Sequence, residues 1–289
     1  MPKTITMPAT PGFISSDFRL NRAVGQTVSP FSGKTKTQEF DRVFWSASVT
    51  LPPMRRDQAK NWQTFLLNCK GGINHFQFID PDAKTNTGTY SGTTLAGEQR
   101  VNNADVTLSF SGSTITAGAS TFANAVVGDF IHITGADNED NNGTHKITTK
   151  TSNTVVVVDS TLVTESSTAN CKVRQNVKGA EALSLEASSN SATGTIKQGD
   201  YLGLLGSTSS ASADPVQLVY VTEDATLTTN SGKDHYSVAV QPKLRSDHTT
   251  KLVHFGTPKG LFRLATNEVS WSADRISNYG INFECVEVI

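Results

Sequence analysis

A mainly β fold with a single α-helix is the fold class that this sequence predicts. Thr, Ser, Asn and Gly are abundant and hydrophobic residues make up 36%, which is typical of many short strands joined by polar turns. Only one segment, near residue 60, carries apolar residues at helical spacing. With 289 residues, the chain has room for about two domains.

Residues 1–40 are extended, are interrupted by prolines and show no helical period. We expect an arm or a set of edge strands here, lying either on a neighbouring subunit or along the chain's own surface. The first clear strand covers residues 43–51, where apolar and small polar side chains alternate. Its apolar face consists of Trp45, Ala47, Val49 and Leu51. Pro52 and Pro53 end this strand, because proline cannot donate to a β-ladder.

One amphipathic helix of about three turns is expected next. Asp57 suits its N-cap or its first turn. The apolar stripe of this helix consists of Ala59, Trp62, Phe65, Leu66 and Cys69. Gly71 and Gly72 supply the stop, since glycine adopts the left-handed conformation without strain. Residues 76–79 then form a strand, which the Asp80-Pro81-Asp82 turn ends.

The middle of the chain begins with residues 83–105, which have the composition of a polar linker. Beyond it, the pattern of residues 127–131 recurs at 198–202, and both copies place Gly-Asp before an aromatic and an aliphatic residue. This pattern is typical of a tight turn that feeds a strand. We therefore expect two small modules of the β-sandwich type, at residues 90–176 and 177–255. Further strands are expected at residues 144–148, 155–158, 216–222 and 236–240, with a turn at Gly232 before the last.

Three strands are expected at the end of the chain, at residues 260–264, 269–272 and 279–289. In the last of these, alternation places Phe283 and Cys285 on one apolar face. Val286 and Val288 make the second face apolar as well. Such a strand is either central in its sheet or covered by a partner.

These patterns define two sets of candidate residues. The core candidates are Trp45, Val49, Leu51, Trp62, Phe65, Leu66, Phe76, Phe78, Trp271 and Phe283. The subunit-interface candidates are Arg55, Arg56, Val286 and Val288. The two arginines stand at the entrance of the helix, where they are either solvated or form paired hydrogen bonds with a neighbouring subunit's carboxylates.

The residues that could carry chemistry do not assemble into a recognisable motif. The sequence contains no GxSxG, HExxH, Walker or GxGxxG pattern. Cys69, Cys171 and Cys285 are widely spaced, so we interpret them as small buried hydrophobic residues. The six histidines are interpreted as solvated strand and loop residues. We expect no enzymatic activity, no catalytic residue, no bound metal and no cofactor.

One oxygen-rich loop, at residues 137–143, invites comparison with a calcium site. Counted from Asp137, the sixth residue is Asn142 and the twelfth is Thr148, where an EF-hand requires glycine and glutamate. A hairpin tip is the favoured interpretation, and adventitious calcium binding is the alternative.

Charge and hydropathy exclude two further classes of function. The net charge is -1, from 25 basic and 26 acidic residues, so no basic excess supports sequence-specific binding of nucleic acid. No apolar run reaches the roughly 18 residues of a membrane span, so membrane insertion is not expected. Residues 1–13 lack the basic region and apolar run of a signal peptide.

Several short motifs follow one another in order over most of the chain. They lie at residues 45–49, 51–54, 62–66, 76–78, 80–82, 199–202, 241–245, 258–264, 274–275 and 279–281. Taken in this order, they resemble the distal tail protein, or minor tail protein, family of long-tailed bacteriophages. The resemblance implies a split, β-rich belt domain with one helix, formed by residues 1–89 and 256–289. Residues 177–255 would be its inserted β-domain.

The resemblance also implies partners and a location. Belt domains close into a ring, typically a hexamer, between the tail tube protein and the tail-tip hub protein. The tape measure protein, side fibres and a host-surface glycan are further possible partners. The protein would be made in the cytoplasm of the bacterial host and reside in the virion, at the tail tip. DNA must pass through such a ring without binding to it, and a chain without an excess of basic residues permits this.

Residues 90–176 depart from the family pattern, because they form a module beyond the usual single insertion. This module is the expected site of any contact with a fibre or with the host surface. The alternative function is therefore that of a tail-attached carbohydrate-binding or adhesion protein.

Overall fold

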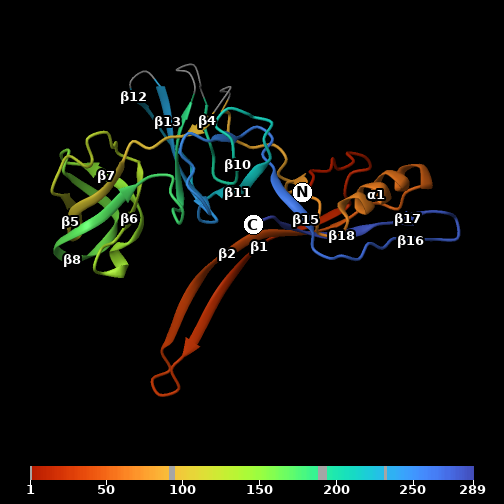
Figure 1. Ribbon diagram of the computed structural model, residues 1–289, viewed down its shortest axis with the longest axis horizontal. Helices are drawn as coiled ribbons and strands as arrows, with labels where there is room; N and C mark the ends of the chain where they lie inside the picture. The colour runs from red at the N-terminus through yellow and green to blue at the C-terminus, as the bar shows by residue number, and fades with distance from the viewer. Residues whose placement is uncertain (1, 91–94, 188–193, 231–232) are drawn as a thin grey trace. The chain divides into compact units, whose positions relative to one another are not determined.

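The computed structural model describes residues 2–90, 95–187, 194–230 and 233–289, and it confirms the predicted mainly β class with one α-helix (Figure 1). The chain separates into two compact units. Unit 1 comprises Met1–Lys84, Asp214–Leu218 and Pro258–Ile289, and unit 2 comprises Thr85–Ala213 and Val219–Thr257. Gly232, where a turn was expected, lies outside the described residues.

Unit 1 is built on a five-stranded antiparallel sheet that joins both ends of the chain. In spatial order its strands are β1 (Ser15–Val28), β2 (Thr35–Thr50), β18 (Asn282–Glu287), β15 (Gly260–Leu264) and β3 (Phe76–Phe78). Two short strands, β16 (Ser272–Ala273) and β17 (Tyr279–Gly280), form a separate two-stranded sheet. The expected strand at 43–51 is thus the second half of a longer strand, β2.

The helix α1 spans Arg56–Cys69 and buries the predicted stripe. Its N-cap is Arg55, whose side chain makes no capping hydrogen bond. Asp57 lies in the first turn, where its negative charge interacts favourably with the positive end of the helix dipole. The helix ends at Lys70, which adopts the left-handed conformation and donates its N–H to the carbonyl of Leu67 at 3.1 Å. The stop therefore begins one residue before Gly71.

The core of unit 1 lies between α1 and one face of the sheet. Trp62 on α1 packs against Phe283 of β18 with ring centroids 6.2 Å apart, and Phe65 packs edge-on against Phe76 at 5.2 Å. Fully burying one such side chain contributes about 1.5–3 kcal/mol. The core candidates that are buried are Trp45, Val49, Leu51, Trp62, Phe65, Leu66, Phe76, Phe78 and Phe283.

Trp271 is not part of this core, because 41% of its surface is exposed. The strand expected at residues 269–272 does not form, and only the two residues of β16 pair with β17. This small hairpin is exposed on β16, and Trp271 beside it stays partly exposed.

Unit 2 contains two sheets with separate cores. The seven-stranded sheet comprises, in spatial order, β11 (Pro215–Val221, of which residues 219–221 belong to unit 2), β10 (Tyr201–Leu205), β14 (Leu252–His254), β4 (Leu95–Gly97), β9 (Ala182–Ala187), β13 (Lys233–Gln241) and β12 (Thr226–Asn230). The four-stranded sheet comprises β5 (Asn102–Ala117), β8 (Val155–Arg174), β6 (Phe130–Thr134) and β7 (Gly143–Lys150). Residues 83–105 are not simply a linker, since they contain β4 and the start of β5.

The repeated Gly-Asp pattern corresponds to one turn geometry used twice. Gly128 and Gly199 have φ of 95° and 94°, a left-handed conformation that favours glycine. The carboxylates of Asp129 and Asp200 each accept the backbone N–H of the residue three positions earlier, at 3.0 and 2.9 Å. Both aspartates are buried, and each turn leads directly into a strand, β6 or β10.

The oxygen-rich loop at 137–143 is organised by hydrogen bonds to protein groups. It contains a short 3-10 helix, η1 (Glu139–Asn141). The buried Asn141 side chain donates to the carbonyl of Val163 at 2.8 Å and accepts from its N–H at 2.7 Å. The asparagine thereby ties the loop to β8, which is a structural use of these oxygen-bearing side chains.

Candidate functional site

The most prominent surface feature of unit 1 is a two-stranded extension of its sheet. β2 pairs with β18 only from Ser46 to Thr50, so the earlier part of β2 pairs with β1 alone. Residues 22–43, called the ribbon here, therefore continue beyond the sheet as a long hairpin (Figure 1). In the described part of the chain no third strand pairs with the ribbon, so both β1 and β2 are edge strands in this region.

The ribbon also carries apolar side chains that no core covers. Val24 and Val28 are exposed on β1, and Phe31 at the tip is 99% exposed. Phe40 is half exposed and its ring lies over Gly25, where a Cβ would approach the ring to 3.0 Å. Exposed apolar groups gathered in one place commonly mark a contact with another molecule.

A bulge interrupts the ribbon near its base. Arg22 pairs with Val43, but Val24 pairs with Glu39, so three residues of β2 lie opposite Ala23 alone. Next to the bulge, the Arg22 guanidinium is 2.9 Å from the Glu39 carboxylate. Bulges bend a strand and increase its local twist, so the ribbon does not simply extend the plane of the sheet.

The interface candidates lie on two different surfaces. Val286 and Val288 are half-buried on the side of β18 that faces away from α1. Arg55 and Arg56 are exposed at the start of α1, and neither forms a salt bridge with another described residue. The structure thus places the two valines on one surface and the two arginines on another, at the start of α1.

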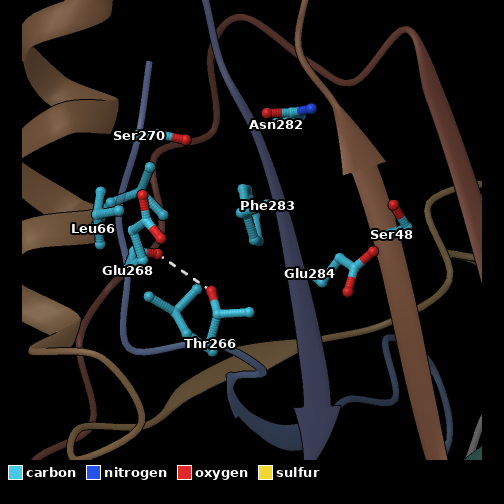
Figure 2. Close-up of a pocket in the computed structure, with 10 residues that line it drawn as sticks. Ser48, Leu66, Thr266, Glu268, Ser270, Asn282, Phe283 and Glu284 are labelled. Carbon is cyan, nitrogen blue, oxygen red and sulfur yellow. Dashed lines mark hydrogen bonds between the residues drawn. The ribbon is translucent and has the colours of Figure 1, made fainter.

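A pocket of about 180 Å³ opens beside β18 (Figure 2). Ala265 donates its N–H to the carbonyl of Glu284, and after it the chain leaves the sheet, so β15 no longer flanks β18 beside Phe283. The lining residues are Ser48, Leu66, Leu264, Thr266, Glu268, Val269, Ser270, Asn282, Phe283 and Glu284. Its apolar floor and its two rim carboxylates suit the alkyl stem and charged head of an arginine or lysine side chain.

Exposed large apolar side chains are concentrated in unit 1. Eleven of them lie there, namely Ile14, Val24, Val28, Phe31, Phe40, Leu67, Ile73, Val216, Trp271, Ile276 and Ile289. Three lie in unit 2, namely Val127, Val163 and Leu227. Unit 1 is therefore the part of the described chain best suited to bury apolar surface against a partner.

Unit 2 has a pocket of different character. It measures about 180 Å³ and is lined by His132, Thr134, Lys172, Arg174, Val177, Lys178 and Asp247. Burial lowers the pKa of His132 to about 4, and repulsion from His145 and Lys243 adds to this shift. The imidazole is therefore neutral near pH 7, and the lysines and Arg174 give the pocket a positive charge.

The structure corrects the interpretation of the histidines and agrees with that of the cysteines. His145, His235 and His248 are buried rather than solvated. All three cysteines are buried and free. Sequence reasoning also missed a buried ion pair between Arg100 and Asp129 and a cluster around His235, because their members come from separate strands.

Comparison with known proteins gives no assignment. No protein-family model matches the chain, and no curated protein matches it. In the portion of the chain that is described, no helix has both the length and the apolar character needed to cross a membrane.

Proposed function

We propose that this chain is a non-enzymatic structural protein of a bacteriophage tail tip. Unit 1 joins with further copies of itself into a ring between the tail tube protein and the tip hub protein, and the family resemblance sets the expected ring at a hexamer. The observation that carries this proposal is the ribbon, a long hairpin to which no third described strand is added and which exposes apolar side chains.

The ribbon needs a partner for physical reasons. An isolated two-stranded hairpin is marginal in water, because it has no second layer on which to bury its apolar side chains. A ring of identical subunits uses heterologous contacts, in which one surface of each copy meets a different surface of the next. The ribbon supplies one such surface, and the outer side of β18 with Val286 and Val288 is a candidate for the other.

Charge complementarity within unit 1 supports a second contact of the same kind. The exposed Arg55 and Arg56 carry positive charge, and Glu268 and Glu284 stand at the rim of the pocket beside Phe283. A guanidinium from the next copy would find an apolar floor for its stem and carboxylates for its head.

The test is a shortened ribbon. Gly25 and Gln38 are cross-strand partners, so removing residues 26–37 and joining the two through Asn-Gly keeps the register and supplies a favoured two-residue turn. The wild-type chain should form a ring of one defined mass in light scattering and in negative-stain images. The shortened variant should remain a monomer while its tryptophan emission stays that of the wild type.

The matched control is Val163→Ser, which removes an exposed apolar side chain from unit 2 and should leave the ring intact. A wild-type chain that stays monomeric at every concentration would contradict the proposal. So would a shortened variant that assembles into the same ring.

The basic pocket of unit 2 favours one specific form of the adhesion alternative. Cationic side chains bind phosphate and carboxylate groups, so the ligand would be an anionic glycan of the host surface. A purified Lys172→Gln and Arg174→Gln double variant should then no longer bind to host envelopes. A purified Lys150→Gln variant should still bind to them as the wild type does. Equal retention of all three proteins would exclude this pocket as an adhesion site.

A further inference from the structure

Three potential metal ligands meet on one face of the seven-stranded sheet. His235 of β13 pairs directly with Glu186 of β9. Ala96 of β4 also pairs with Glu186, so Glu98, two residues later, lies diagonally across on the same face. One ligand atom from each of Glu98, Glu186 and His235 lies within 4.8 Å of the other two.

Several polar atoms at this place are buried and make no hydrogen bond. His235 is 3% exposed, and its Nδ1 lies 2.5 Å from Oε2 of Glu98 without the angle of a hydrogen bond. Ser184 Oγ, two residues before Glu186 on the same face, and Arg100 Nε are likewise without a hydrogen-bond partner among the described residues. Buried polar atoms are nearly always satisfied, so a group that bonds to them belongs here.

The charges around the cluster point to a cation. Arg100 is paired with Asp129, and Lys233 is paired with one oxygen of Glu186. The carboxylate of Glu98 faces the carboxylate of Glu186 and the imidazole of His235, which is positive only when protonated. A partly desolvated carboxylate of this kind is stabilised by a nearby positive charge.

We propose that Glu98, Glu186 and His235 bind a divalent transition-metal cation of the zinc or manganese type. One imidazole nitrogen with two carboxylate oxygens is a mixed ligand set that favours these ions over calcium and magnesium, which prefer oxygen alone. The exposed sides of the two glutamates leave room for water at the remaining coordination positions. This inference concerns unit 2 and does not rest on the proposed ring.

The geometry requires one small adjustment. Tetrahedral zinc with ligands at about 2.1 Å places neighbouring ligand atoms about 3.4 Å apart. Nδ1 of His235 and Oε2 of Glu98, now 2.5 Å apart, must therefore separate by about 1 Å. The Glu98 side chain is 30% exposed, so it can make this movement without disturbing the buried imidazole.

The test uses the full chain after treatment with a chelator and dialysis. Titration calorimetry with zinc chloride, and separately with manganese chloride, should show one saturable site per chain, whereas calcium chloride should show none. Glu98→Gln and His235→Gln should each weaken binding by about tenfold or more. Glu181→Gln and His254→Gln, at positions outside the cluster, should bind as the wild type does.

Thermal unfolding supplies a second readout that also checks folding. A cation that binds only the folded state raises Tm, so zinc should raise Tm of the wild type and not that of Glu98→Gln. Without metal, Glu98→Gln should keep the wild-type circular dichroism. Equal binding by Glu98→Gln and wild type would overturn the proposal. Absence of zinc and manganese binding to the wild type would also overturn it, and would assign the cluster to an ion pair alone.

Discussion

Glu287 accepts a hydrogen bond from the backbone N–H of Leu218 at 2.9 Å, although 69 positions separate the two residues. The other oxygen of the same carboxylate accepts the N–H of Trp45 at 3.1 Å. The indole N–H of Trp45 in turn donates to the carbonyl of Leu218 at 2.9 Å. Two side chains thus satisfy both backbone groups of Leu218 and hold the 214–218 segment within unit 1.

Replacing Glu287 with alanine should destabilise unit 1 by about 3 kcal/mol, because two buried N–H groups lose a charged acceptor. Urea unfolding followed by tryptophan fluorescence reports this unit selectively. All three tryptophans of the chain lie in unit 1, namely Trp45, Trp62 and Trp271. Glu284→Ala, on the exposed side of the same strand, should leave the midpoint nearly unchanged. Equal shifts for the two variants would contradict the role assigned to Glu287.

The elements of unit 1 were predictable where a local period decides burial. The stripe on α1 and the alternation in β2 and β18 needed only the spacing of apolar residues, since each repeats along the chain. Glu287 fell on the apolar face of its strand by the same alternation. Its bond to Leu218 could not be foreseen, because nothing local brings residues 69 positions apart together.

The features that the sequence did not predict correctly share a physical cause, which is that they depend on tertiary context. The composition around Trp271 suggested a core strand, but the short hairpin that forms there leaves Trp271 partly exposed. β4 is three residues long, too short to show a period inside a polar segment. Glu98, Glu186 and His235 meet only because β9 is flanked by β4 and β13, an order that spacing along the chain does not encode.

The ion pair between Arg100 and Asp129 should be important for unit 2. Both side chains are almost fully buried, and Ser237 also donates to the Asp129 carboxylate, at 2.8 Å. Asp129→Ala leaves a buried guanidinium without its counter-charge and should cost about 3–5 kcal/mol. Circular dichroism during urea unfolding would measure this loss, while tryptophan fluorescence should show that unit 1 is unaffected.

The matched control for that experiment is Lys197→Ala, which breaks the exposed pair with Asp224 at 2.6 Å. Solvent screens such a pair, so the unfolding midpoint should not change measurably. A similar loss of unfolding free energy in both variants would mean that burial does not make the pair between Arg100 and Asp129 more stabilising than an exposed pair.

Acid should destabilise unit 2 through His248. This side chain is 1% exposed, and burial lowers the pKa of His248 from 6.5 to about 4. Between these two pH values His248 is protonated in the unfolded chain and neutral in the folded chain. The free energy of unfolding therefore decreases as pH falls from about 6.5 to about 4. The contribution should reach about 2 kcal/mol at pH 5.

Urea midpoints measured between pH 7 and pH 5 would test this. His248→Gln should flatten the pH dependence, whatever its stability at pH 7. Some slope should persist, because burial also lowers the pKa of His132 to about 4. A slope identical to that of the wild type would exclude His248 as a source.

The thiols should be unreactive in the folded protein. Burial raises the pKa of Cys69 to about 11 and raises the pKa of Cys285 further. Since the thiolate is the reactive form, Ellman's reagent at pH 8 should label native protein slowly and label all three cysteines in urea. Cys171→Ala leaves only Cys69 and Cys285, so its labelling rate reports the opening of unit 1. Rapid labelling of the native variant would contradict their burial.

The bulge opposite Ala23 has a consequence for the isolated chain. A flat hairpin with open edges can serve as a template on which strands from other molecules add without limit, producing fibrous aggregates. A local twist interrupts such growth, and the charges of Lys36 and Glu39 resist an apolar fit along the edge. The irregularity that makes the ribbon harder to extend would thus protect newly made chains from open-ended strand addition.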